Sequence, residues 1–129
     1  MLSAIHTWSG YLVFLIVLAT SITAYSQAKY AREFTSGRYV LALVLLDVQV
    51  LLGFVVYVTG RFWEANPETA YVHPALALAA LGSGHMLMRA AKATTNAADA
   101  HRLAGKALIV AIVLITAAIG VASAPPFIN

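Results

Sequence analysis

Four long apolar stretches alternate with short polar ones along this chain. The apolar stretches cover residues 2–25, 39–60, 71–89 and 103–123, and polar connections cover residues 26–38, 61–69 and 90–102. A helix of about 20 apolar residues crosses the hydrocarbon core of a bilayer. The stretches lack the strict alternation that membrane barrel strands need. The pattern therefore predicts an all-α, integral membrane four-helix bundle in which residues 1–129 form a single domain.

The composition supports a membrane protein and excludes several other classes. Hydrophobic residues make up 61% of the chain and charged residues 10%, whereas a soluble domain carries roughly 25% charge. The chain has no cysteine, which excludes disulfides and thiolate metal sites. The first stretch lacks the basic n-region of a signal peptide, so we expect it to be retained. The net charge of +3 comes from cations that flank the apolar stretches, which argues for a lipid bilayer as partner and against nucleic acid.

The cations predict which way the helices cross the membrane, because connections rich in Lys and Arg stay in the cytoplasm. The first and third connections, with their flanking turns, hold Lys29, Arg32, Arg38, Arg89, Lys92, Arg102 and Lys106. The second connection and the termini hold only Arg61. We therefore expect a multi-pass protein of the plasma or inner membrane, up-down-up-down, with both termini outside. The residues after Pro125 are expected to fray there.

Two further expectations concern the surface and the packing. Aromatic side chains gather at membrane interfaces, which predicts an outer belt of Trp8, Phe62, Trp63 and Tyr71 and an inner belt of Tyr25, Tyr30 and Tyr39. Small residues let membrane helices approach closely. Because the third stretch is rich in alanine and glycine, we expect it to have the most neighbours.

The four histidines fall into two pairs by depth. His6 and His73 lie near the outer ends of their stretches, and His85 and His101 lie near the inner ends. Two neutral imidazoles from facing helices at equal depth are what a bis-histidine haem needs. His73 and His85 are separated by about 18 Å along one helix, so two cofactors would stack across the membrane. We predict an outer haem b, with a second, inner haem as the weaker expectation.

Small residues and cations near the histidines fit the same interpretation. A residue four positions on shares a helix face, and the positions that would leave room beside a macrocycle are Gly10, Ala77 and Gly105. Candidate propionate partners are Arg61 outside and Arg89 and Arg102 inside. The alternative is that histidines at membrane ends simply face lipid headgroups, and it is strongest for His101.

Other polar residues are weaker candidates. Asp47 lies about 13 Å inside the second stretch, where it is protonated or paired. It would orient a histidine through the second ring nitrogen, pair with Lys106 or relay protons. A soft copper site is an alternative interpretation of His85, Met86 and Met88. Adjacent helix positions diverge by about 100°, so His85 and Met86 do not chelate one ion together.

Three segments resemble one four-helix half of the haem A synthase family. They are residues 5–12 (IHTWSGYL), 47–53 (DVQVLLG) and 73–78 (HPALAL). The resemblance implies that His6 and His73 form one pair of haem ligands near the outer face. The family's catalytic acidic residue precedes a histidine-arginine pair, whereas His6 is followed by Thr7 and His101-Arg102 is preceded by Asp99-Ala100. Full-length members contain two such halves. Only haem binding is therefore expected to carry over.

Three functions are consistent with these features. The preferred one is a small transmembrane cytochrome b that passes electrons between a membrane donor, such as quinol, and an outer acceptor. The alternative is a non-catalytic accessory or assembly subunit of a respiratory complex that handles haem. A further alternative is a half-size haem A synthase-like enzyme that acts as a homodimer.

Overall fold

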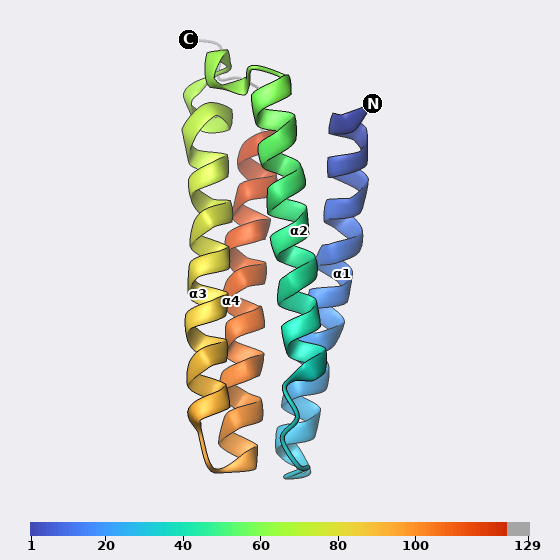
Figure 1. Ribbon diagram of the computed structural model, residues 1–129, viewed down its shortest axis with the longest axis vertical. Helices are drawn as coiled ribbons and strands as arrows, with labels where there is room; N and C mark the ends of the chain where they lie inside the picture. Colours follow the sequence, from blue (N-terminus) through green and yellow to red (C-terminus); the bar gives the residue numbers. More distant parts are fainter. Residues whose placement is uncertain (124–129) are drawn as a thin grey trace.

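The computed structural model describes residues 1–123, which form four long helices packed side by side (Figure 1). The helices are α1 (Leu2–Lys29), α2 (Gly37–Thr59), α3 (His73–Ala93) and α4 (Ala97–Ser123). No strand occurs in this part of the chain, and the all-α prediction is confirmed. The predicted position of the C-terminus and the fraying after Pro125 lie outside the described residues.

Three of the four helices, α1, α2 and α4, are long and apolar enough to cross a membrane. The third predicted span, α3, has 21 residues but is not among them. The reason is its composition: glycines, a serine, two histidines, Arg89 and Lys92 interrupt its apolar residues. The structure is consistent with a membrane protein through the other three helices.

The helices extend beyond the apolar stretches because polar residues continue or cap them. α1 runs on to Lys29, and α4 begins at Ala97 instead of residue 103. The Asn96 side-chain oxygen accepts the backbone N–H of Asp99 at 3.0 Å, which caps the first turn of α4. Between α2 and α3, a 3₁₀ turn η1 (Phe62–Glu64) is followed by a π-helical turn η2 (Glu68–Val72).

The packing order around the bundle places α1 and α3 diagonally. α4 packs against α1 and α3, α2 packs against α1, and the contact between α2 and α3 is looser. Within the described residues, the backbones of α1 and α3 make no close contact. Consecutive helices run in opposite directions, so the N-terminus lies at the same end as the α2–α3 connection (Figure 1). We call this the N-terminal end of the bundle.

The most buried helix is α4, which contributes nine buried residues, whereas α3 contributes four. Most of the nine are alanines, which let α4 pack closely against its neighbours. The expectation that the third stretch has the most neighbours is therefore wrong. Part of its small surface faces outward, at Ala75, Ala79 and Gly82.

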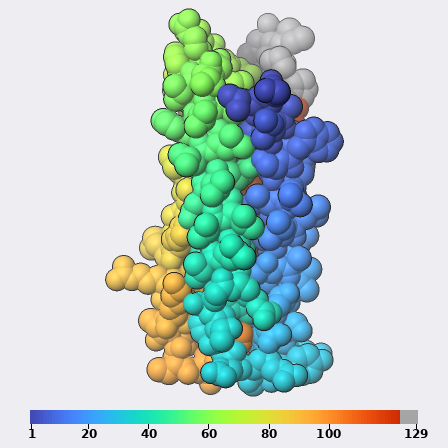
Figure 2. All heavy atoms as spheres, turned by 45° about the vertical axis from the view of Figure 1, so that its right-hand side comes forward, coloured from blue at the N-terminus to red at the C-terminus, as the bar shows by residue number. Residues whose placement is uncertain are grey.

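One predicted belt residue lies in the core. Tyr39 is fully buried, because its hydroxyl has a partner inside the bundle, as described below. Trp8, Tyr71 and Tyr30 are largely exposed, as an interfacial position requires. Figure 2 shows α1 and α2 side by side along the whole face.

Candidate functional site

The structure brings His6 and His73 together at the N-terminal end of the bundle. His6 lies in the second turn of α1 and His73 begins α3, so the two rings come from diagonal helices. Their centres are 6.4 Å apart and their planes are inclined by 85°. Imidazole nitrogens bind first-row metals at about 2.0–2.1 Å, so two rings that share one ion have centres about 6 Å apart. The observed spacing of 6.4 Å is close to that distance.

The ring of His73 is oriented by α4. Its Nδ1–H donates to the backbone carbonyl of Ala118 at 2.8 Å. Hydrogen bonding of one ring nitrogen to a carbonyl is the usual way in which a ligating histidine is fixed, and it leaves the lone pair on Nε2. Pro74 lies in the first turn of α3, where a missing N–H costs nothing. At the start of α3, the ring of His73 lies near His6 of α1 and the Ala118 carbonyl of α4.

The ring of His6 is held by α2. The Gln49 amide nitrogen donates to the His6 carbonyl at 2.6 Å and to His6 Nδ1 at 2.9 Å. The neutral ring then carries its proton on Nε2 and has to change tautomer before that nitrogen binds a metal. The Ser9 hydroxyl donates to the Gln49 amide oxygen at 2.7 Å. One turn along α2, a Cβ on Gly53 would lie 2.7 Å from Cε1 of the His6 ring. The His6 ring therefore packs directly against the α2 backbone at Gly53, where there is no side chain.

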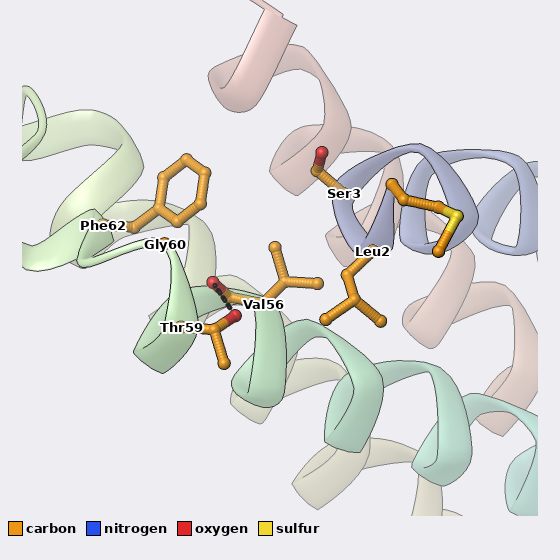
Figure 3. A pocket seen from close by; sticks show the side chains of 7 residues that line it. Leu2, Ser3, Val56, Thr59, Gly60 and Phe62 are labelled. Carbon is orange, nitrogen blue, oxygen red and sulfur yellow. Dashed lines mark hydrogen bonds between the residues drawn. The ribbon is translucent and has the colours of Figure 1, made fainter.

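A cavity of about 480 Å³ opens between the ends of α1 and α2, one turn beyond His6. Figure 3 shows the residues around it, which come from α1 (Leu2 and Ser3), from α2 (Val56 and Thr59) and from the turn that follows α2 (Gly60 and Phe62). Cofactor sites are typically concave and mostly apolar, with volumes of about 300–1,000 Å³. Neither His6 nor His73 is among the residues that line this cavity, so it does not enclose the pair.

The donor set favours a macrocycle over a bare ion. Within residues 1–123 there is no group of three or more histidine, aspartate or glutamate side chains that could hold a metal. A zinc ion takes about four ligands, three or four of them from protein. Haem iron needs only two axial ligands, because the macrocycle supplies the others. The number of histidines at the site therefore equals the number of axial ligands that haem iron needs.

His101, predicted as an inner ligand, has both ring nitrogens occupied. The Tyr39 hydroxyl donates to Nδ1 at 2.7 Å, and Nε2–H donates to the Arg32 carbonyl at 3.0 Å. The Phe34 ring packs edge-on against it, with centres 5.1 Å apart. His101 is only 2% exposed. The hydrogen bond to Arg32 therefore links the α1–α2 connection to the start of α4.

His85, the other predicted inner ligand, pairs with Asp47 of α2. Its Nε2 lies 2.8 and 3.1 Å from the two carboxylate oxygens. Among the three roles considered for Asp47, hydrogen bonding to a histidine is the one observed. The structure thus places His85 and His101 in separate hydrogen-bonded groups and does not bring them together.

Two of the small positions expected to face a macrocycle accommodate side chains of this chain instead. A Cβ on Gly105 would lie 2.9 Å from the Tyr25 ring, and one on Gly10 would lie 2.9 Å from the Gln49 amide. Both glycines therefore serve helix packing. Ala77 is half-buried on α3, one turn from His73.

The three candidate arginines are all on the surface. Arg61 forms an ion pair with Glu64, and Arg102 pairs with Asp99 at 2.9 Å. Arg89 is exposed near the end of α3. Exposed pairs of this kind contribute little to stability, so Arg61 remains available to an anion at the N-terminal end.

The sequence analysis gave no site role to Gln49 or Gly53. The signal was present, because a glutamine inside an apolar stretch lies four residues before a glycine and thus shares its helix face. Which helix that face meets depends on the rotation of α2 in the bundle, and the sequence pattern does not specify it.

No family model matches the chain, and no characterised protein or solved structure is detectably similar to it. The resemblance to the haem A synthase family therefore rests on the three short segments alone.

Proposed function

We propose that this chain is a small membrane cytochrome that holds one haem b between His6 and His73. The observation that carries the proposal is the pair itself: two rings from diagonal helices with centres 6.4 Å apart. Cofactors of helical bundles are held by side chains of facing helices. Haem held by two imidazoles carries one electron reversibly.

The surrounding residues position the two ligands. The Ala118 carbonyl fixes the ring of His73, and Gln49 and Gly53 fix the ring and backbone of His6. Arg61, at the same end of the bundle, is the cation proposed to meet a propionate through a charge-assisted hydrogen bond. It would exchange Glu64 for that anion.

We further propose that all four helices cross the bilayer and that the N-terminal end faces outward. The support is the cation bias: the opposite end of the bundle holds most of the lysines and arginines, and such ends stay in the cytoplasm. α3 packs against α4, one of the three candidate spans, which supports a fourth crossing despite its lower apolarity.

Cysteine labelling tests this orientation. An impermeant maleimide added to intact cells should label a Ser3→Cys variant and leave a Lys92→Cys variant unlabelled. Both positions are exposed in the structure, so accessibility within the protein does not limit labelling. The reverse pattern would overturn the orientation.

The visible spectrum of the purified protein tests haem binding. We expect sharp, low-spin bands in both redox states, a pyridine haemochrome of haem b, and one haem per chain, because only one histidine pair is assembled. One reversible transition in a redox titration supports an electron carrier. Rapid transfer of the haem to an apo-globin would instead favour the haem-handling subunit. A colourless protein from haem-replete cells would refute the proposal.

A matched pair of glycine variants tests the packing at His6. Gly53→Ala places a Cβ 2.7 Å from the His6 ring, whereas Gly82→Ala meets nothing within 4 Å. Both changes raise helix propensity by about the same amount. We expect haem affinity to fall on the order of tenfold or more in Gly53→Ala, as when a ligand loses its positioning, and to stay unchanged in Gly82→Ala. Equal haem affinity in the two variants would contradict the site.

A further inference from the structure

An aspartate and a histidine join α2 to α3 on the bundle surface, far from either end. His85 Nε2 lies 2.8 Å from an Asp47 oxygen, and the two side chains are 50% and 38% exposed. At 1.5 Å per residue, Asp47 lies about 15 Å from the start of α2 and His85 about 12 Å from the end of α3. Ionisable groups at membrane depth almost always face the protein interior or a cavity. We therefore expect a bound molecule to cover this half-exposed pair.

The pair leaves one hydrogen-bond acceptor open. A carboxylate only accepts, so the proton of this hydrogen bond is on His85 Nε2, and the neutral form of the ring would keep its lone pair on Nδ1. Within the described residues, no group hydrogen-bonds His85 Nδ1. The hydrogen bond to Asp47 fixes the orientation of the ring. The surface thus presents an oriented acceptor toward the acyl chains.

The residues around the pair are mostly apolar and leave open space, and the exposed Arg89 lies one turn further along α3. Gly82 precedes His85 by three positions on the same helix face, and a Cβ there would meet nothing within 4 Å. Asp47 shares its face of α2 with Val44 and Leu51, which are 43% and 63% exposed. Met86 follows His85 and is 75% exposed, and its thioether favours contact with aromatic rings. A flat apolar ring suits this surface.

We propose that Asp47 and His85 form a docking site for a hydroquinone dissolved in the bilayer, whose ring hydroxyl donates to His85 Nδ1. The occupant must enter from the lipid, carry a strong donor and present a flat ring, and a lipid-soluble hydroquinone combines the three. Binding at this site requires neither His6 nor His73. Its use as an electron source for the haem rests on the function proposed above.

Binding of a hydroquinone with a decyl tail to the protein in nanodiscs tests the site. We expect saturable binding to the natural chain, weakened at least about tenfold in His85→Gln and Asp47→Leu. Glutamine keeps a donor for Asp47 but lacks an acceptor at the Nδ1 position. The matched control is Asp99→Leu, which removes an exposed carboxylate from the first turn of α4 and should bind normally. The dimethyl ether of the probe, which cannot donate, should bind at least about tenfold more weakly.

Three outcomes would overturn the docking site. They are equal binding of the probe and its dimethyl ether, normal binding in His85→Gln, and a dimer that Asp47→Leu converts to a monomer, which would place the pair between two copies of the chain. Thermal unfolding of each variant checks that it is folded, and the conservative His85→Gln keeps the test valid if Asp47→Leu fails to fold. Haem content measured on the same samples should not change. Probe binding by a protein that takes up no haem would refute the haem proposal alone.

Discussion

Replacing either His6 or His73 by alanine is expected to remove haem from the protein. The two rings are the only histidines brought to a shared centre in the described residues, with 6.4 Å between them. Loss of a residue that merely orients a ligand costs about 10–100-fold in affinity, so loss of the ligand itself should cost more. The low-spin bands should disappear from the purified protein, and any residual haem should be five-coordinate and high-spin.

The matched control is His85→Gln, which also removes a histidine from the helical bundle. Because His85 pairs with Asp47 on the bundle surface, this variant should keep its haem and its spectrum. Unchanged haem content in both His6→Ala and His73→Ala would refute the proposed site. Loss of haem in His85→Gln, with the protein folded, would revive the inner pair expected from sequence.

α1, α2 and α4 could be predicted from sequence because their apolar stretches are long enough to force one structure. In an apolar environment only a helix or a closed barrel satisfies its own backbone. The ends were less predictable, since they depend on single contacts such as the Asn96 cap of α4. The apolar stretch therefore sets the middle of a helix, and local hydrogen bonds set its last turns.

Depth along the helices was enough to pair His6 with His73 but not to place the other two histidines. A residue's position in an apolar stretch gives its height in the bundle and leaves open its rotation about the helix axis. His85 contacts Asp47 and His101 contacts Tyr39, two α2 residues that lie about 12 Å apart along the helix. The two histidines therefore differ in height as well as in rotation. The same missing rotation explains why Tyr39 is in the core and why Gly105 receives the Tyr25 ring.

His101→Ala is expected to be the most destabilising single change. It would leave the buried Tyr39 hydroxyl and the Arg32 carbonyl without their partner. Each buried polar group left unsatisfied costs about 1–3 kcal/mol, and the lost ring contacts with Phe34 add to that cost. We expect the free energy of unfolding in detergent to fall by about 2–4 kcal/mol. Circular dichroism during thermal or denaturant unfolding measures the change.

Two companion variants separate hydrogen bonding from packing and from haem ligation. His101→Phe keeps a ring of similar size, so it should recover the packing but remain destabilised. Combining it with Tyr39→Phe removes both partners of the 2.7 Å hydrogen bond, and the double variant should be more stable than the sum of the single losses. Haem bound per folded protein should stay unchanged in all three, because both His101 nitrogens are occupied by this chain. A specific loss of haem with unaltered stability would show that His101 is a ligand after all, and that the Tyr39 hydroxyl and the Arg32 carbonyl give it up when haem binds.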